Sequence, residues 1–279
     1  MSGVGWSWDP SLYSGSAAYY GRGGRVPYPA ELAESLAVAL HLDGSGQLLD
    51  VGCGPGSLTL LLAPLFEEAT GVDADPEMIA EAGRLAADAG VVNVVWRQVR
   101  AEDLPAGLGI CRLITFAQSF HWMDRPKVAA IVRDMLDEGG ACVHVHATTH
   151  AGVDTKLALP NPEPPRRAIN DLVHRYLGPI RRAGQGVLIH GTLGNESDIY
   201  RVASFGGPER IEIPGRVVTR SANDVVASVF SLSSSAPHLF GEQLPEFTAE
   251  LRHLLRAASP TEVFSEYHRE IALDIWRPS

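Results

Sequence analysis

The sequence predicts an α/β fold: a doubly wound, mostly parallel sheet with helices on both faces. Short apolar runs that suit buried strands alternate with amphipathic helical segments between residues 47 and 148. A glycine-rich turn joins the first of these runs to the helix that follows it. After residue 150 the alternation breaks at a proline-rich, partly helical segment, which predicts a helical insertion after strand five.

The expected elements follow one another along the chain. An irregular arm rich in Gly, Ser, Tyr and Trp precedes a helix at 29–40. The expected strands lie at 47–51, 69–73, 91–99, 111–117, 141–148, 210–213 and, as one long strand, 263–276. The expected helices lie at 57–65, 76–89, 126–136, 166–183 with a break at Gly178-Pro179, 221–232 and 245–258.

These elements divide the chain into four parts. We expect an N-terminal arm and helix at 1–46 that cover the active site, and an α/β core at 47–149. A helical insertion or substrate cap follows at 150–207, and residues 208–279 complete the sheet.

Composition and charge limit the partners. The chain has 279 residues, of which 45% are hydrophobic and 20% charged, an ordinary globular composition. A formal net charge of -10 argues against nucleic acid and against anionic membranes, because Lys and Arg clusters bind both. Three widely spaced cysteines, an N-terminus unlike a secretory signal and no membrane-spanning apolar run predict a cytoplasmic protein.

The strongest chemical signal is LLDVGCGPG at 48–56. Glycines at 52, 54 and 56 let the backbone approach a ligand closely, and the following helix presents free N–H groups. Nicotinamide and flavin folds share such glycine turns. Asp50, however, would repel a pyrophosphate and suits an ammonium or sulfonium ligand, which disfavours the alternative of a nicotinamide-dependent oxidoreductase.

Three further motifs follow strands two, three and four. Asp73 in GVDADPEM is placed to accept hydrogen bonds from ribose hydroxyls, and Met78 either packs on an adenine face or belongs to the core. Glu102 in AEDLP can accept from an adenine amino group. The segment FAQSFHW at 116–122 ends strand four, beside the switch point where open α/β sheets bind ligands.

Together these motifs resemble the class I S-adenosylmethionine-dependent methyltransferases, in particular the type 11 small-molecule enzymes. LDEGG at 136–140 also resembles their Pro-Gly-Gly turn, with Glu138 in place of the usual proline. The arm YYGRGGRVPYP at 19–29 and the QSFHW motif resemble one subgroup, in which the arm folds over the cofactor. The resemblance implies a seven-stranded sheet with an antiparallel last strand, S-adenosyl-L-methionine as cofactor and S-adenosyl-L-homocysteine as product.

The resemblance also implies a set of cofactor contacts. Asp50, Gly52 and Gly54 would line the methionine end, Asp73 would hold the ribose, and Tyr20 and Arg25 would close over the methionine carboxylate. The full implied set is Tyr20, Arg25, Asp50, Gly52, Cys53, Gly54, Asp73, Ala74, Met78, Ala101, Glu102 and Ala117.

Methyl transfer requires the protein mainly to align the reacting atoms and exclude water. His121 is the best candidate for a general base, although it could instead only pack beside Trp122. Tyr20 and Gln118 are candidates to orient the acceptor through hydrogen bonds. Oxygen, nitrogen and carbon acceptors all stay open, because fold does not fix chemistry.

The aromatic arm suits a planar small-molecule acceptor, including a carbon of an electron-rich ring such as an indole. The alternatives are an O- or N-methyltransferase of a small natural product and a protein that binds the cofactor without methylating. A Gly-, Ala- and Arg-rich composition associates the chain with bacterial secondary metabolism.

The aromatic residues of the arm have a second interpretation besides an acceptor pocket. They could pack the arm onto its own domain or onto a second subunit of a homodimer; they are Trp6, Trp8, Tyr13 and Tyr19.

Two other groups of side chains allow both a functional and a purely structural interpretation. His144, His146 and His150 invite a metal site, but carboxylates are absent nearby in the sequence, so we predict core or pocket-wall histidines and no metal. The arginines of the insertion suit either a solvated face or a site for an anionic substrate; they are Arg166, Arg167, Arg175, Arg181 and Arg182.

Overall fold

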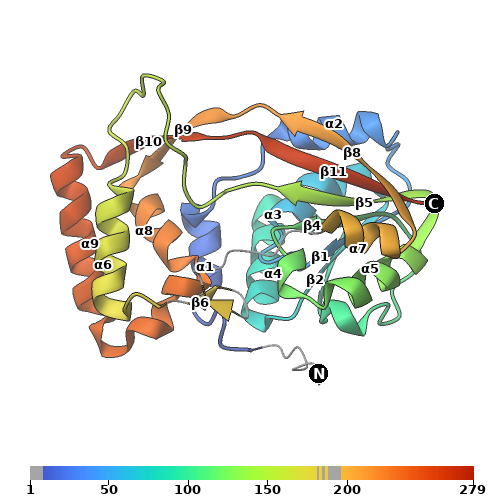
Figure 1. The fold of residues 1–279 in the computed structure, drawn as a ribbon, viewed down its shortest axis with the longest axis horizontal. Helices are drawn as coiled ribbons and strands as arrows, with labels where there is room; N and C mark the ends of the chain where they lie inside the picture. Colours follow the sequence, from blue (N-terminus) through green and yellow to red (C-terminus); the bar gives the residue numbers. More distant parts are fainter. Residues whose placement is uncertain (1–8, 181, 184–185, 188–195) are drawn as a thin grey trace.

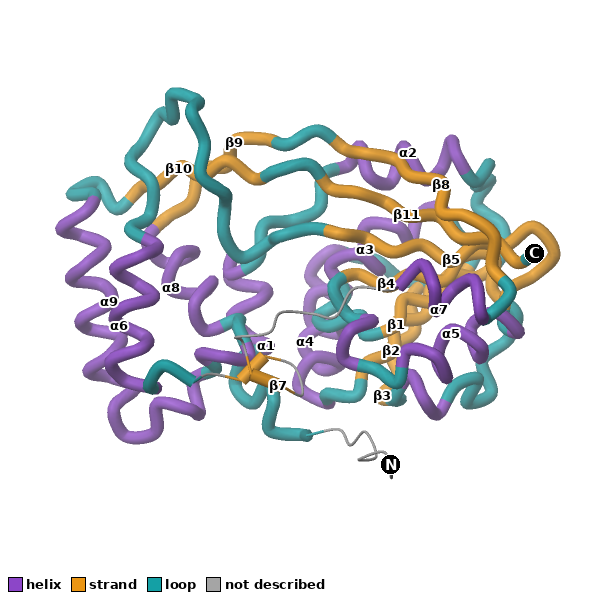
Figure 2. Tube along the Cα trace, viewed as in Figure 1, coloured by secondary structure: helices purple, strands orange, loops and turns teal. Residues whose placement is uncertain are grey.

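The structure, a computed structural model, describes residues 9–180, 182–183, 186–187 and 196–279. Figure 1 shows an elongated molecule in which a sheet with flanking helices occupies one end and a group of helices occupies the other. The chain continues from one edge of the sheet toward the helical end, and the N-terminal helix lies between the two parts (Figures 1 and 2).

A mixed sheet of seven strands forms the core, with the order β3-β2-β1-β4-β5-β11-β8. Neighbours among the first five strands pair in parallel, and β11 is antiparallel to both β5 and β8. This confirms the predicted fold class and the antiparallel last strand. The strands are β1 (Gln47–Val51), β2 (Glu68–Asp73), β3 (Val94–Gln98), β4 (Cys111–Ala117), β5 (Leu136–His146), β8 (Phe205–Ile213) and β11 (Ile271–Pro278).

Helices cover both faces of this sheet and build a separate cap. Leu32 and Leu62 join one buried cluster with the sheet, and Val128 and Tyr200 join another. The helices are α1 (Ala17–Tyr19), α2 (Ala30–Ala39), α3 (Ser57–Leu62), α4 (Pro76–Ala89), α5 (Arg125–Asp134), α6 (Arg166–Leu177), α7 (Glu196–Val202), α8 (Ala222–Phe230) and α9 (Leu244–Ala258).

Local signals explain where several helices begin and end. Asp75 caps α4 by accepting from the backbone N–H groups of Glu77 and Met78, and Gly90 ends the helix in a left-handed conformation with φ +67°. Ser221 and Asp224 form the expected capping box at the start of α8.

The cap rests on a third buried cluster, which joins α6, α8 and α9. Its aromatic centre includes Phe230, Phe240 and Phe247, whose rings stack or meet edge to face. A two-stranded antiparallel sheet of β9 (Arg216–Ser221) and β10 (Val263–His268) lies beside these helices (Figure 2). A short hairpin, β6 (Arg182–Ala183) with β7 (Gly186–Val187), completes the described strands.

Several predicted boundaries are wrong. The expected strand 263–276 is two strands, because Arg269 and Glu270 break it and each half pairs with different partners. The expected helix end at residue 136 is instead the start of β5, where the pairing register with β4 shifts and Gly139 adopts φ +92°. The predicted strand at 210–213 starts too late, because β8 begins at Phe205, and no strand was predicted where β9 lies. The predicted helix at 166–183 ends too late, because α6 ends at Leu177.

Among the described residues, no helix has the length and apolar character that crossing a membrane requires.

Candidate functional site

The glycine turn after β1 meets the end of β4. Gly52 has φ +67°, and a Cβ atom built there would lie 2.5 Å from the Cβ of Ser119, so both conformation and space require glycine. The Ser119 hydroxyl donates to the carbonyl of Val51 at 2.6 Å. Gly54 has no neighbour within 4 Å of such a Cβ, which leaves this part of the turn open. Ser119 was not singled out in the sequence, although it belongs to the FAQSFHW motif.

Asp50 is buried beneath this turn, with 1% of its surface exposed. Its carboxylate accepts hydrogen bonds from the Thr59 hydroxyl at 2.6 Å and the Thr115 hydroxyl at 2.8 Å. Burial raises the pKa of Asp50. The carboxylate therefore ties β1 to α3 and β4, and only its remaining lone pairs are left for a ligand.

Asp73 lies at the end of β2 and contacts the glycine turn directly. Its Oδ2 accepts from the Gly54 N–H at 2.8 Å, and its Oδ1 accepts from the Asp75 N–H at 2.9 Å. Burial raises the pKa of Asp73 from 3.8 to about 6, in spite of both hydrogen bonds. The predicted ribose acceptor and the predicted glycine turn are thus adjacent.

The next two predicted residues differ in their exposure. Met78 has 2% of its surface exposed and packs in the core, while Ala74 beside it is half-buried. The backbone carbonyl of Ala74 accepts from the side chain of Gln98 at 3.3 Å. Cys53 is buried within the turn and its thiol donates to the Gly54 carbonyl at 3.3 Å.

Glu102 lies in a short 3-10 turn, Ala101–Asp103, after β3. Its side chain is 8% exposed and accepts from the Asp124 N–H at 2.9 Å. The Arg100 guanidinium is 3.6 Å from the other carboxylate oxygen. Asp103, by contrast, is exposed. Glu102 is therefore the buried acid of this motif and connects it to the loop before α5.

The end of β4 carries an unusual backbone conformation. Gln118 has φ +57°, a region that favours glycine, and it follows Ala117, the last residue of the strand. The Gln118 amide donates to the Val145 carbonyl at 3.1 Å, so the side chain turns toward β5. His121 follows in the 3-10 turn Phe120–Trp122.

A row of aromatic rings connects this turn to the N-terminal arm. The ring centroids of His121 and Trp122 are 5.0 Å apart, those of Trp122 and Tyr13 are 5.6 Å apart, and those of Tyr13 and Tyr20 are 6.3 Å apart. Two of the predicted catalytic candidates, His121 and Tyr20, are therefore the two ends of one row. We call His121, Trp122, Tyr13 and Tyr20 the aromatic row.

The arm also approaches the two buried acids. Burial raises the pKa of Tyr13, and the charges of Tyr20 and Asp73 add to that shift. Burial and the charge of Asp50 raise the pKa of Tyr28, a residue the sequence analysis did not select. The arm thus packs over its own domain, with Tyr13 on the Asp73 side and Tyr28 on the Asp50 side. Trp6 and Trp8 lie outside the described residues.

Arg25 links the arm to the cap. Its guanidinium lies over the Tyr20 ring, with Cζ 4.5 Å from the centroid, and donates to the Tyr20 hydroxyl at 3.1 Å. It also donates to the carbonyl of Ser231 at 2.8 Å and to the Ser231 hydroxyl at 3.0 Å, at the end of α8. Tyr20 and Arg25 were predicted together, and the structure brings them together.

His121 is neutral at physiological pH. Burial, and then the positive charge of Arg125, lower the pKa of His121 from 6.5 to about 4. A neutral imidazole can accept a proton but is a weaker base than one with an unshifted pKa.

The basic insertion is partly neutralised within the cap. Arg166 pairs with Glu266 at 2.7 Å and Arg175 pairs with Glu250 at 2.9 Å. Arg220, on β9, also contacts Glu266 at 3.3 Å and donates to the carbonyl of Gly23 in the arm at 2.7 Å. The side chains of Arg181 and Arg182 lie outside the described residues.

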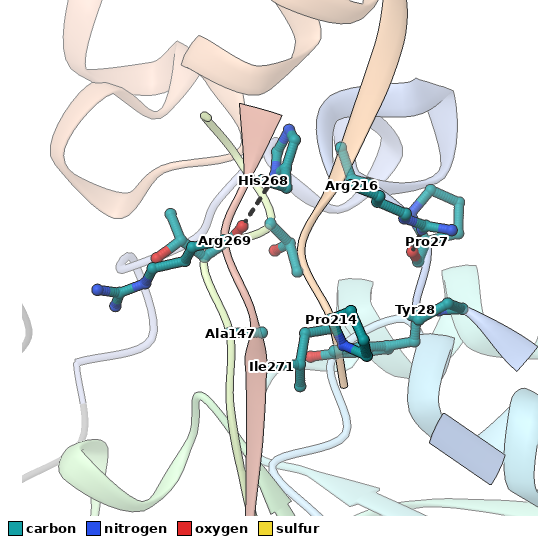
Figure 3. A pocket seen from close by; sticks show the side chains of 12 residues that line it. Pro27, Tyr28, Ala147, Pro214, Arg216, His268, Arg269 and Ile271 are labelled. Carbon is teal, nitrogen blue, oxygen red and sulfur yellow. Dashed lines mark hydrogen bonds between the residues drawn. The ribbon is translucent and has the colours of Figure 1, made fainter. Parts of the chain in front are cut away.

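Two cavities lie away from this site. One of about 20 Å³, with room for about one water molecule, lies between the arm and the strand ends near Tyr28, Arg216 and His268 (Figure 3). The other, of about 260 Å³, opens beside Gln47 and Glu68, at the opposite ends of β1 and β2 from the glycine turn. Neither is lined by the aromatic row.

The residues present fit S-adenosylmethionine. Asp73 and Glu102 are acceptors suited to ribose hydroxyls and an adenine amino group, and Gly54 leaves open backbone between the acid at Asp73 and the arm. None of these features requires a phosphate partner, and the buried Asp50 opposes one.

Part of the chain is similar to known methyltransferases. Residues 48–140 match the family described as "Methyltransferase domain". The chain is 35% identical over 95 residues to the uncharacterized methyltransferase YcgJ of Bacillus subtilis, a match that covers 34% of this chain and 38% of YcgJ. It is 35% identical over 102 residues to trans-aconitate 2-methyltransferase of Escherichia coli, covering 35% and 37% of the two chains. These matches span less than half the length of either relative.

The fold comparison extends over most of the chain. The crystal structure of YcgJ superposes with a TM-score of 0.50 at 16% identity, covering 89% of this chain and 99% of YcgJ. A S-adenosylmethionine-dependent methyltransferase from Thiobacillus denitrificans, in complex with S-adenosyl-L-homocysteine, gives a TM-score of 0.50 at 15% identity, covering 95% and 98%. The motifs, the sheet order and these matches agree: residues 48–140 are a methyltransferase domain, and the chain has the class I S-adenosylmethionine-dependent methyltransferase fold.

Proposed function

We propose that this chain transfers the methyl group of S-adenosyl-L-methionine to a planar small-molecule acceptor bound against the aromatic row. The observation that carries the proposal is that the row begins at the end of β4 and crosses to Tyr13. Close to Tyr13, the Gly15 N–H donates at 2.8 Å to Glu77 in the first turn of α4, the helix that follows Asp73. The proposed acceptor surface and the proposed ribose acid are therefore neighbours.

The cofactor would be held by residues from three strand ends and the arm. Asp73 would bind the ribose, Glu102 and Ala101 the adenine, and Gly52, Gly54 and the Ala117 backbone the methionine part. Arg25 and Tyr20 would face the methionine carboxylate. When bound, the cofactor supplies an electrophilic methyl group on a sulfonium, so the work left to the chain is orientation and exclusion of water.

The acceptor class rests on the shape and chemistry of the row. Aromatic rings favour flat partners that stack or meet them edge to face. Carbon methylation of an electron-rich ring such as an indole needs no charged base before the methyl is transferred, which suits the neutral His121 and its pKa of about 4. His121 would accept the proton that the ring loses after transfer, while Tyr20 and Gln118 would orient the acceptor.

A role in the secondary metabolism of a bacterium is the biological setting we propose. Its support is compositional, since the chain is rich in Gly, Ala and Arg. The trans-aconitate enzyme among the relatives carries, by its name, a carboxylic acid substrate, so carboxylic acids belong among the acceptors to be tried.

The test is turnover of S-adenosyl-L-methionine labelled in its methyl group. The purified protein is incubated with indoles, phenols, amines and carboxylic acids, and the position of the label in any product is determined by NMR. Label on a ring carbon supports the proposal. Label on oxygen or nitrogen rejects carbon methylation, and cofactor binding without turnover across the panel favours a protein that binds without methylating.

A pair of variants tests whether the acceptor binds against the aromatic row. Trp122→Leu removes the ring between His121 and Tyr13, and we expect KM for the acceptor to rise at least tenfold while cofactor affinity changes little. Trp96→Leu is unsuitable as a control, because Trp96 packs against the glycine turn. Phe240→Leu removes a ring that belongs to the cap core and not to the row, and it should leave KM unchanged.

A further inference from the structure

A row of polar side chains crosses one face of the sheet beneath α7. Neighbouring strands pair Phe116 with His144, His144 with Asp274, and Asp274 with Arg210. Because side chains alternate along a strand, His146 lies on the same face as His144, two residues further along β5. Glu196, the first residue of α7, approaches these histidines across that face.

Three of these side chains converge. Glu196 Oε2 is 3.5 Å from His144 Nδ1 and 3.9 Å from His146 Nε2. One ligand atom from each of the three residues lies within 4.8 Å of the other two. Metal–ligand bonds of about 2.0–2.2 Å place neighbouring ligands of a tetrahedral ion about 3.3–3.6 Å apart. The separation of Glu196 from His144 therefore fits a single ion, and that of Glu196 from His146 is slightly longer.

The second nitrogen of His144 is already held in the way that metal-binding histidines usually are. His144 Nε2 lies 2.6 Å from the Tyr200 hydroxyl, which in turn lies 3.4 Å from Cys142 Sγ. Phe120 packs edge to face on the imidazole, with the ring centroids 4.8 Å apart. A partner on Nε2 fixes the ring orientation and leaves Nδ1 to face Glu196.

His146 supplies an independent observation. Its Nε2 is buried and makes no hydrogen bond of regular geometry to any described residue, although Asp274 Oδ2 lies 3.2 Å away. Asp274 is itself engaged by Arg210, which donates to both of its oxygens at 2.6 and 2.7 Å. A buried nitrogen without a hydrogen bond requires an explanation, and an ion at this point provides one.

We propose that His144, His146 and Glu196 bind a divalent transition-metal ion of the zinc class. Two imidazoles and one carboxylate suit such ions, and three protein ligands leave a fourth position for water or another small ligand. The ion would fasten the start of α7 to β5. This differs from the expectation of no metal, because the carboxylate comes from Glu196, far along the chain from both histidines.

The test measures metal binding directly and does not depend on methyl transfer. Protein freed of metal with a chelator is titrated with ZnCl2 by calorimetry, and separately with Co²⁺ while its visible absorption is recorded. We expect one site of micromolar or tighter affinity in the wild type. Glu196→Gln, which keeps the shape of the side chain, and His146→Ala should each weaken binding at least tenfold. His253→Ala removes an exposed histidine of α9 and should leave the affinity unchanged.

Each outcome decides the proposal. Loss of binding in both site variants, with an unchanged far-ultraviolet circular dichroism spectrum and unchanged affinity in His253→Ala, supports the site. Equal zinc affinity in wild type and in both variants, or no zinc binding by the folded wild type, overturns it. In those cases the three side chains form only polar contacts within the fold.

Discussion

Asp73 and Gly54 are joined by a hydrogen bond of 2.8 Å from the Gly54 N–H to Asp73 Oδ2. The bond connects the end of β2 to the glycine turn after β1. It places a carboxylate with a pKa of about 6 at the point where we propose that the cofactor binds. Several of the testable consequences depend on this junction and on the arm that covers it.

Cofactor affinity should depend on pH through Asp73. The ionised carboxylate is the better acceptor for ribose hydroxyls, so affinity for S-adenosylhomocysteine should fall as pH drops below about 6, by at most about tenfold per unit. The free energy of unfolding of the cofactor-free protein should respond in the opposite sense. The pKa of Asp73 is higher in the folded than in the unfolded state, so protonation of this carboxyl stabilises the folded state. The contribution of Asp73 to stability is present below about pH 4 and is lost as pH rises through about 6.

Calorimetry between pH 5 and pH 7.5 checks this dependence. Asp73→Asn should bind more weakly at pH 7.5 and show no dependence on pH near 6. If the variant keeps the pH dependence of the wild type, another group is responsible.

Gly23 should be required for the arm to pack against α8. It has φ +82°, and a Cβ at this position would collide with the carboxylate of Asp224 in α8. Gly23→Ala should therefore weaken S-adenosylhomocysteine binding at least tenfold by displacing the arm. Gly44→Ala is the matched control, because Gly44 has φ +86° but open space around it. Equal affinities of the two variants would show that the arm does not contribute to cofactor binding.

His121 should affect turnover more than binding. If it takes the proton released by the acceptor, His121→Gln should lower kcat by about 10²-fold or more, with little change in cofactor affinity. Because the pKa of His121 is about 4, its protonation should not limit kcat above about pH 5. Steady-state kinetics of His121→Gln and of the exposed-site control His253→Gln check this. A rate within twofold of wild type would assign His121 to packing beside Trp122.

Tyr200 should stabilise the sheet through its hydroxyl. The side chain is fully buried, and its hydroxyl is 2.6 Å from His144 Nε2. Tyr200→Phe leaves that nitrogen without its partner and should lower the free energy of unfolding by about 1–3 kcal/mol. Urea unfolding of chelator-treated protein measures this. Tyr267→Phe serves as the control, since its hydroxyl has no hydrogen bond among the described residues. Equal stability of Tyr200→Phe and wild type would contradict the account.

The parallel core could be predicted because its signals are local. Strand β1, the glycine turn and α4 are each marked by neighbouring residues such as Asp50, Gly54 and Asp75, whose roles depend on the next few positions. The capping pair of Ser221 and Asp224 is another local signal. These are the segments whose ends the sequence analysis located to within a residue or two.

The features that the sequence analysis missed depend on contacts between residues that lie far apart in the sequence. Polar residues interrupt the alternation at His268, Arg269 and Glu270, but such an interruption does not by itself show that the chain changes sheets there. Glu196 likewise meets His144 and His146 only after the chain has crossed from β5 to the cap and returned.

Calorimetric titration with S-adenosylhomocysteine tests the central claim most directly, using wild type, Asp73→Ala and Asp103→Ala. Asp103 is exposed and matches Asp73 in charge. We predict micromolar or tighter binding by wild type and by Asp103→Ala, and at least tenfold weaker binding by Asp73→Ala, equivalent to about 1.4 kcal/mol. No binding by correctly folded wild type, or equal affinity in all three proteins, would contradict the assignment of the cofactor and its anchor.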